Sequence, residues 1–170
     1  MSAPTPSTLI DAVNERDEEV GTVLRGEALR QGQNFRTAHV FILNRNGCLL
    51  LQRLASQRER HPDRWGSSVA AYLFAGETYR DAAVRRMREE LGVTAKLESV
   101  GKIEMQDLES LKFVSLFLAH ADEAAIRDPA HIAQLKYWPI EEVEAGLETR
   151  CEIFTPTFVQ LFRTFRDELR

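Results

Sequence analysis

The chain has 170 residues, a formal net charge of −4 and a sequence pI of about 5.6. Its length fits one domain, and 44% hydrophobic with 28% charged residues is a globular composition that excludes a fully disordered chain. The acidic balance argues against a nucleic-acid surface, and no apolar run approaches the ~18 residues that span a bilayer.

The first residues and the cysteines indicate a reducing compartment. Residues 1–6 lack the basic and apolar regions of a signal peptide, which predicts a cytoplasmic protein. Cys48 and Cys151 do not form a close pair, so we expect two small buried hydrophobes rather than a disulfide. Zinc-ligand spacing is absent from the four histidines, which are His39, His61, His120 and His131.

The first half of the chain is expected to form short strands. Residues 1–8 predict a loose tail, so that residues 9–170 form a single domain. Strands are predicted at 9–13 and 20–24, one helical turn at 26–30, and loops at 31–36 and 54–65. Between these loops, Asn44–Gly47 carries an Asn-Gly turn signal between two apolar runs, 37–43 and 48–53, which indicates a β-hairpin.

The second half begins with a strand at 67–73 and a helix from Thr78 to Leu91. Thr78 is a suitable N-cap with Asp81 three residues later, and Gly92 supplies a C-terminal stop. A buried stripe is predicted at i+4 spacing, formed by Ala83, Met87 and Leu91. Further elements are expected as strands at 95–104, 111–119 and 133–138, a helix after Pro139 and a helix from Thr155-Pro156. Mostly antiparallel strands with few helices indicate an α+β fold.

The predicted central helix carries the sequence GETYRDAAVRRMREELGV over residues 76–93. It resembles the Nudix box, G-x5-E-x7-R-E-U-x-E-E-x-G-U, in which U is aliphatic. The positions that match are Glu77, Arg85, Met87, Glu89, Glu90, Gly92 and Val93. The resemblance covers residues 71–93 directly and extends more weakly over most of the chain. It implies a Nudix-type α/β/α sandwich with a mixed sheet and a central Nudix helix.

The physical chemistry of these residues agrees with the resemblance. Glu89 and Glu90 end the helix as adjacent carboxylates, and Mg²⁺ prefers carboxylate, water and phosphate oxygens. We therefore expect both to be catalytic metal ligands for Mg²⁺, with Mn²⁺ as a substitute. Glu77 in the preceding turn is positioned to accept from Arg85. A solvated, ion-paired helix face is the alternative, and Gly76, Glu77 and Gly92 at fixed offsets argue against it.

Two positions depart from the Nudix pattern. Ala71 replaces its leading glycine, which reshapes the end of a strand. Arg86 replaces the glutamate one turn before the acidic pair, and the resemblance implies that this glutamate ligates metal. The substitution predicts either fewer or more weakly bound ions, or a direct contact from Arg86 to substrate phosphate, which suits arginine.

The Arg-Arg pair also resembles isopentenyl-diphosphate isomerase, a Nudix relative, and residues 65–72 resemble its W-x-N-S-V-C-G-H segment. However, the catalytic cysteine of that enzyme falls on Ala70, and its metal-binding histidines fall on Tyr72 and Phe35. Its catalytic glutamate falls near Lys112. Alkene isomerisation needs a positioned acid and base, so the resemblance does not predict isomerase activity here.

Many bacterial Nudix proteins of the nucleoside-diphosphate hydrolase type fit better, since Gly76–Tyr79 and Ala82-Ala83 match their pattern. Such chemistry also needs a base or water-orienting group. The candidates are Glu89, Glu104, Asp107 and Glu109, and we favour Glu109 beside the acidic pair because 104–110 is expected to be a loop. Arg53, at the end of a hairpin strand, is a further candidate for binding phosphates. Each of these residues has an alternative as ordinary solvated surface.

Two functions follow as hypotheses. The first is a Mg-dependent diphosphohydrolase acting on a nucleoside-diphosphate-type small molecule. The second is a non-hydrolytic nucleotide or diphosphate-binding module in which Arg86 has abolished turnover. Neither involves nucleic acid or a membrane, and the protein is expected to be a monomer or a homodimer.

Overall fold

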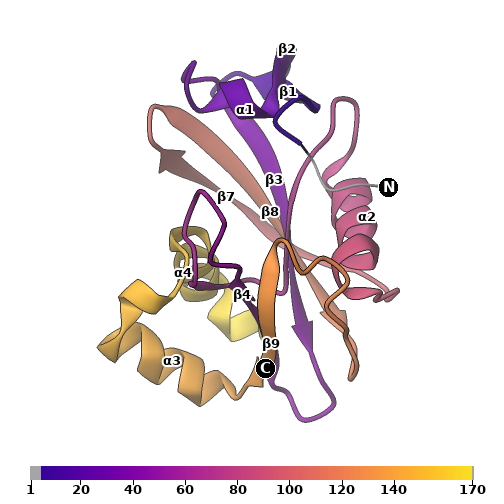
Figure 1. The fold of residues 1–170 in the computed structure, drawn as a ribbon, viewed down its shortest axis with the longest axis vertical. Coiled ribbons are helices and arrows are strands. Elements are labelled where there is room, and N and C mark those ends of the chain that lie inside the picture. The colour runs from indigo at the N-terminus through magenta and orange to yellow at the C-terminus, as the bar shows by residue number, and fades with distance from the viewer. Residues whose placement is uncertain (1–4, 170) are drawn as a thin grey trace.

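The computed structural model describes residues 5–169 as strands and helices arranged around one mixed sheet (Figure 1). The strands are β1 Leu9–Val13, β2 Glu19–Leu24, β3 Phe35–Leu43, β4 Leu49–Leu54, β5 Trp65–Gly66, β6 Val69–Tyr72, β7 Glu98–Asp107, β8 Ser110–His120 and β9 Ile132–Trp138. The helices are α1 Arg25–Ala28, α2 Tyr79–Leu91, α3 Ile140–Thr149 and α4 Pro156–Phe165, with 3₁₀ turns at Cys151–Ile153 and Arg166–Leu169. None of the helices in residues 5–169 is long and apolar enough to cross a membrane.

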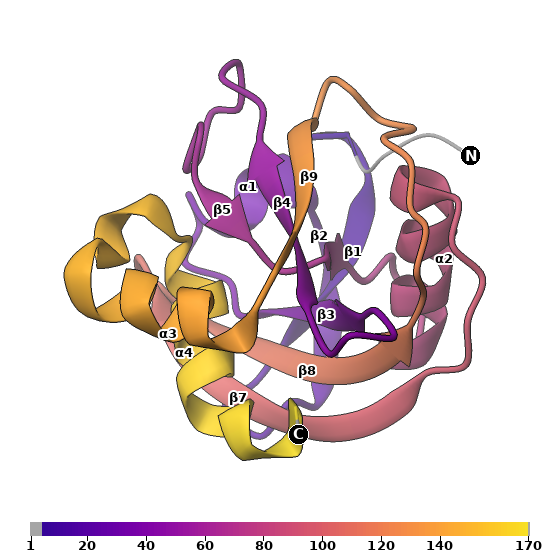
Figure 2. The same ribbon diagram turned by 90° about the horizontal axis from the view of Figure 1, so that it is seen from below.

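The central strand of the sheet is β3. It runs parallel to β8, from the pair Phe35 and Lys112 to the pair Leu43 and His120, and antiparallel to β6. Helix α2 covers one side of this sheet, while α3 and α4 lie on the other side (Figure 2). These layers confirm the predicted α+β sandwich with a mixed sheet and a central helix.

Alternating side chains of β3 build two separate cores. Ala38, Val40 and Ile42 pack in the cluster that contains the apolar stripe of α2, including Met87. Phe41 and the other side chains of the opposite face pack with the phenylalanines of α4. Period-two alternation of a buried strand therefore gives each helical layer its own apolar surface.

The predicted hairpin between β3 and β4 forms, but it is short. Asn44–Gly47 make the turn, with the Gly47 N–H donating to Asn44 O at 2.9 Å and Gly47 at φ 74°. Leu43 and Leu49 then pair, after which the two strands take different partners. From there β4 pairs with β9 and β5, which opens the sheet beside α2.

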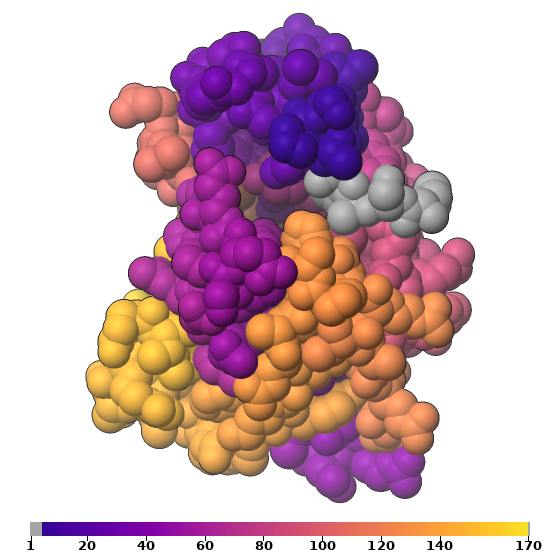
Figure 3. Space-filling model, in the orientation of Figure 1, coloured from indigo at the N-terminus to yellow at the C-terminus, as the bar shows by residue number. Residues whose placement is uncertain are grey.

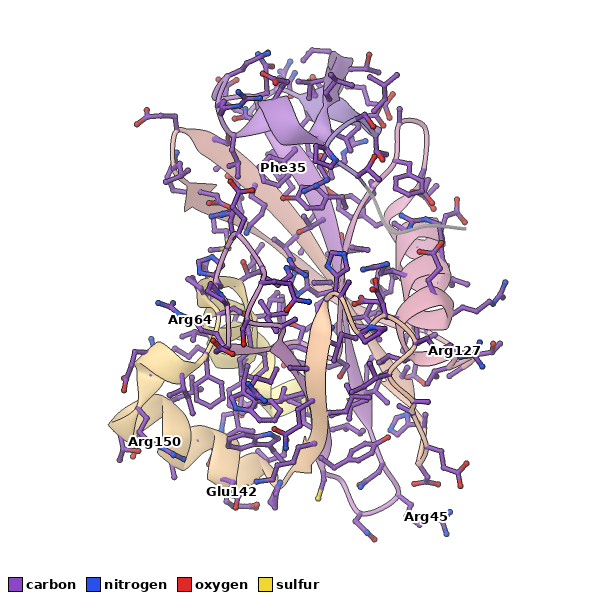
Figure 4. The ribbon with its side chains drawn as sticks, in the orientation of Figure 1. Phe35, Arg45, Arg64, Arg127, Glu142 and Arg150 are labelled. Carbon is purple, nitrogen blue, oxygen red and sulfur yellow. The ribbon has the colours of Figure 1, made fainter. Side chains whose placement is uncertain are left out.

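The two predicted N-terminal strands are present, and they pair with each other in a sheet separate from the central one. Its buried face packs on Phe35, which Figure 4 shows below α1 and β1. Of the expected tail, residues 1–4 lie outside the described residues. Residues 5–8 form a turn held against α1, in which Pro6 O accepts from the Gly26 N–H at 3.0 Å.

Three local expectations differ from the structure. Strand β3 begins at Phe35, inside the expected loop 31–36. The expected loop 104–110 is instead a tight turn, because β7 continues to Asp107 and β8 resumes at Ser110, with Leu108 at φ 52°. Cys48 and Cys151 are free thiols, as expected, but both are half-buried rather than buried.

Candidate metal and diphosphate site

Helix α2 begins and ends as its sequence predicts. The Thr78 hydroxyl accepts from the Asp81 N–H at 3.1 Å, which caps the first turn. Gly92 ends the helix at φ 64°, a left-handed conformation that glycine adopts without a Cβ clash. These two ends fix the register of the helix and thereby the direction of its last acidic residues.

Glu77 and Arg85 brace the turn before α2 against the helix. Arg85 Nε and Nη2 donate to the two carboxylate oxygens of Glu77, both at 2.9 Å, and Nη2 also donates to Tyr72 O at 3.0 Å. Glu77 Oε1 accepts in addition from the Phe74 N–H at 2.7 Å. This bidentate pair is geometrically specific, and it joins β6, the turn and the helix in the way the resemblance suggested.

Glu89 and Glu90 lie together at the C-terminal end of α2, and each has an oxygen without a donor. Oε1 of both residues is buried and has no hydrogen-bond partner among the described residues. Burial, the largest influence, raises the pKa of Glu90 to about 7, against the opposing effect of Arg86. Buried acceptors without donors are costly, so these oxygens are suited to a ligand that brings positive charge.

Arg86 is the cation closest to these carboxylates, and it is buried. Its guanidinium lies 3.1 Å from Glu90 Oε1, 3.5 Å from Glu89 Oε2 and 3.2 Å from Asp128 Oδ2. The contact with Glu90 is an ion pair without the geometry of a hydrogen bond, which leaves Glu90 Oε1 unsatisfied. Arg86 is therefore directed at carboxylates in this structure, and its contact with substrate phosphate stays a prediction.

Asp128 belongs to residues 121–131, a segment that we call the strap. The strap is tied to the end of α2, because Leu91 O accepts from the Ala125 N–H at 3.2 Å and Glu90 O from the Arg127 N–H at 2.9 Å. The Arg127 side chain occupies the place where a Cβ of Gly92 would lie. The strap thus satisfies carbonyls that a helix end leaves without partners.

Arg85 also reaches the acidic pair, because its Nη1 donates to Glu89 Oε2 at 3.5 Å, and Arg58 from the loop 55–64 is a further cation near it. Arg58 Nη1 lies 2.6 Å from Nδ1 of His131 at the end of the strap, and among the described residues no carboxylate pairs with Arg58. Burial, the largest influence, lowers the pKa of Arg58, while the charge of Glu90 opposes that shift. Figure 3 shows the surface hollowed between the N-terminal strands and this loop. Sequence reasoning missed Arg58 because the polar segment 54–65 has no periodicity.

Other predicted residues are not brought to this site. Arg53 shares the sheet face of Leu51, opposite α2, and contacts Asp63 and Gln134. Glu109 is exposed in the turn between β7 and β8, beside Gly32. Strand alternation accounts for Arg53, and the longer β7 carries Glu109 away from the helix.

The remaining base candidates lie beside α4 or in another ionic cluster. The carbonyl of Glu104 accepts from Gln160 of α4 at 3.4 Å. Asp107 accepts from Arg60 Nη2 at 2.6 Å and from Lys112 Nζ at 3.1 Å. Its pKa is lowered, since these hydrogen bonds outweigh the opposing effect of burial. Asp107 is thus fully engaged as a structural counter-ion.

The positions aligned with isomerase ligands hold different chemistry. Phe35 and Tyr72 stack with ring centroids 5.5 Å apart at 22°, where the resemblance to the isomerase places histidines. Lys112, at the position aligned with its glutamate, is buried and hydrogen-bonds Thr157 at 2.8 Å. An aromatic pair and a cation occupy these positions, which agrees with the prediction against isomerase chemistry.

The donor set around Glu89 and Glu90 fits a single divalent cation. Residues 5–169 contain no group of three or more His, Cys, Asp or Glu side chains arranged to hold a metal. Two carboxylates, each with a buried oxygen that accepts no hydrogen bond, could serve as ligands for Mg²⁺, which keeps several waters and shares substrate phosphates.

A NUDIX domain model matches residues 33–161, so the chain belongs to the Nudix family. The matched segment contains the Glu77–Arg85 pair, which we call the brace, together with the acidic pair and the strap. A crystal structure of a Deinococcus radiodurans protein superposes with a TM-score of 0.81 at 27% identity, covering 92% of this chain and 98% of that one.

Curated relatives come from two groups within the family. An uncharacterized Nudix hydrolase of Listeria innocua is 40% identical over 90 residues, 52% of this chain and 53% of the relative, so this chain spans about half the length of that protein. An isopentenyl-diphosphate Delta-isomerase of Nocardia farcinica is 28% identical over 159 residues, 89% of this chain and 91% of the enzyme. These matches parallel the two resemblances found in the sequence.

Proposed function

We propose that this Nudix protein is a Mg²⁺-dependent hydrolase that cleaves a diphosphate linkage in a nucleoside-diphosphate-type small molecule. The single observation that carries the proposal is the pair of buried Oε1 atoms on Glu89 and Glu90 that accept no hydrogen bond. Family membership and the relatives with hydrolase names support the reaction class, while the relatives with isopentenyl-diphosphate isomerase names support a diphosphate-containing ligand. Mn²⁺ is an expected substitute for Mg²⁺.

The residues of the chain have distinct tasks in this proposal. Glu89 and Glu90 hold the divalent cation, which neutralises phosphate charge and exposes phosphorus to attack by water when it is bound. Glu89 is the base candidate that lies at the site, so we assign the orienting of the attacking water to its carboxylate. Glu77 and Arg85 keep the turn and helix in register.

Arg58 replaces Arg53 and Arg86 as the proposed phosphate-binding side chain. It has no carboxylate partner among the described residues, and it lies near enough to Glu90 for that charge to affect its pKa. Guanidinium groups bind phosphate with two parallel N–H donors. A diphosphate held between Arg58 and a cation on Glu90 would have its charge balanced from both sides.

The test is a substrate screen with a matched pair of variants. Nucleoside diphosphates and triphosphates, nucleotide sugars and isopentenyl diphosphate are each incubated with Mg²⁺, and release of phosphate or pyrophosphate is measured. Glu90→Gln should lower turnover by about 100-fold, whereas Glu98→Gln, an exposed carboxylate on β7, should leave turnover unchanged. Circular dichroism checks that both variants fold. The absence of product from every compound would refute the proposal.

A non-hydrolytic binding module is the second candidate, and the three carboxylate contacts of Arg86 favour it. A buried guanidinium that neutralises the acidic pair would weaken cation binding and leave a ligand bound without turnover. In that case the wild type should show no measurable activity, and Arg86→Glu, which restores the family motif, should give turnover at least tenfold above the detection limit. If the wild type turns over and Arg86→Glu gives no increase, the binding-module alternative is excluded.

A further inference from the structure

The strap places a third carboxylate against Arg86. Asp128 Oδ2 lies 3.2 Å from Arg86 Nη2, which donates a hydrogen bond to it, and the Asp128 side chain is 20% exposed. The same guanidinium faces Glu89 and Glu90 from its other atoms. Asp128 is outside the Nudix box, in a segment whose sequence shows no motif. Arg86 therefore has one anionic partner that is not part of the acidic pair.

The position of Asp128 is set by the backbone of the strap. Its carbonyl accepts from the N–H groups of His131 and Ile132, both at 3.0 Å, while Arg127 is bonded to Glu90 O. Asp128 is thus flanked on one side by a bond to α2 and on the other by the start of β9. A side chain held in this way directs its carboxylate at Arg86 without depending on a flexible loop.

We propose that Asp128 is a positioning residue that holds Arg86 aside when a divalent cation binds Glu89 and Glu90. A cation on these carboxylates competes with the Arg86 guanidinium for the same charge. A buried guanidinium left without any counter-ion is strongly unfavourable. Asp128 removes that cost, because it remains paired with Arg86 after Glu89 and Glu90 have turned to the cation. This inference rests on the proposed cation site.

The arrangement also explains how the chain retains the acidic site despite the substitution at position 86. An arginine there without an external partner would have only Glu89 and Glu90 to neutralise it. With Asp128 present, the guanidiniums of Arg85 and Arg86 face four carboxylates, those of Glu77, Glu89, Glu90 and Asp128, so the cluster keeps net negative charge for a cation. The positive charge that Arg86 brings to this position is thus offset by the negative charge of Asp128.

The test measures cation binding directly, without turnover. Mn²⁺ is titrated into the full chain, and free Mn²⁺ is followed by electron paramagnetic resonance. Asp128→Asn should weaken Mn²⁺ binding by about tenfold, the lower end of effects reported for partners that orient metal ligands. Asp128→Glu, which keeps the charge, should bind within about threefold of wild type. Asp122→Asn is the matched control, since Asp122 lies in the same strap but pairs with exposed Arg45.

The same substitution in an Arg86→Met variant distinguishes two roles of Asp128: positioning Arg86, or binding the cation directly. In Arg86→Met, Asp128→Asn should change the Mn²⁺ affinity by less than twofold, because there is no guanidinium to hold. A tenfold loss in both backgrounds would show that Asp128 is itself a ligand and would overturn the positioning role. Equal affinities for wild type and Asp128→Asn would overturn it as well and leave the proposed function intact. If wild type binds no Mn²⁺ at millimolar concentration, the cation site and this inference fail together.

Discussion

The ionic cluster around Asp107 and the one at the end of α2 are both buried, but they differ in how well their carboxylate oxygens are satisfied. Around Asp107, both carboxylate oxygens accept from cations, with Arg60 on one side and Lys112 on the other. At the end of α2, Glu89 and Glu90 each keep a buried oxygen without a donor. Both clusters contain ion pairs, but only the cluster at the end of α2 leaves buried carboxylate oxygens without a hydrogen bond.

The pKa directions of the two clusters show the same contrast. Hydrogen bonds from Arg60 and Lys112 outweigh burial and lower the pKa of Asp107. Burial outweighs Arg86 and raises the pKa of Glu90 to about 7. A carboxylate that is buried and ion-paired is therefore not in itself a sign of function. The combination of burial, neighbouring acids and missing donors distinguishes the candidate site.

The largest expected effect comes from breaking the cluster around Asp107. Asp107→Asn should lower the free energy of unfolding by about 3 kcal/mol at pH 7, because Lys112 would be left buried without its counter-ion. The pKa of Asp107 is lowered in the fold, so its contribution is present above the unfolded value of 3.8 and is lost as pH falls. Urea unfolding at pH 7 and near pH 3 measures the difference. An equal cost at both values would contradict the assignment.

The next effect concerns the cation without a carboxylate partner. Arg58→Met should reduce kcat/KM for the diphosphate substrate by about 30-fold, equivalent to about 2 kcal/mol, the usual strength of a hydrogen bond to a charged group. Stability should change little, because no ion pair of Arg58 with the described residues is lost. Arg64→Met, at the other end of the same segment, is the matched control. Equal kinetics for wild type and Arg58→Met would remove Arg58 from the site.

The fold and part of the site were predictable because their signals are local. The cap at Thr78, the stop at Gly92, the i+4 stripe and the Asn-Gly turn each depend on residues close in sequence. The Glu77 and Arg85 brace followed from fixed spacing within one turn and one helix. Short-range backbone chemistry is readable without knowledge of the tertiary structure.

The rest depended on contacts between distant segments. Asp128 contacts Arg86 although the two residues are 42 positions apart in the sequence, and Arg58 contacts His131 at a separation of 73 positions. Pairing of β3 with β8 in parallel has no local signal either. The general-base candidates were misplaced for a simpler reason: three more strand residues, Met105 to Asp107, turn an expected loop into a tight turn. Small errors in element bounds move a side chain to another part of the molecule.

A smaller loss of stability is expected when the ion pair of Glu77 with Arg85 is weakened. Glu77→Gln keeps the shape of the side chain but removes the charge that receives both Arg85 donors. We expect a loss of about 1 kcal/mol in the free energy of unfolding, and thermal unfolding with Mg²⁺ absent measures it. Glu59→Gln, in the loop before β5, gives the baseline for removing one charge. A cost no larger than that of the control would show that the brace does not stabilise the turn.

The smallest expected effect is on kcat, and it tests whether Glu109 acts as the base, as the sequence suggested, or lies away from the site, as in the structure. Glu109 was the favoured base, yet it is exposed in the turn between β7 and β8, beside Gly32. Glu109→Gln should therefore change kcat by less than about twofold, since a base must reach its proton directly or through one water. Initial rates at saturating substrate and Mg²⁺ measure this. A fall of 100-fold in kcat would mean that the turn moves to the acidic pair during the reaction. In that case, buried carboxylate oxygens without hydrogen bonds would not be a sufficient guide to the catalytic groups.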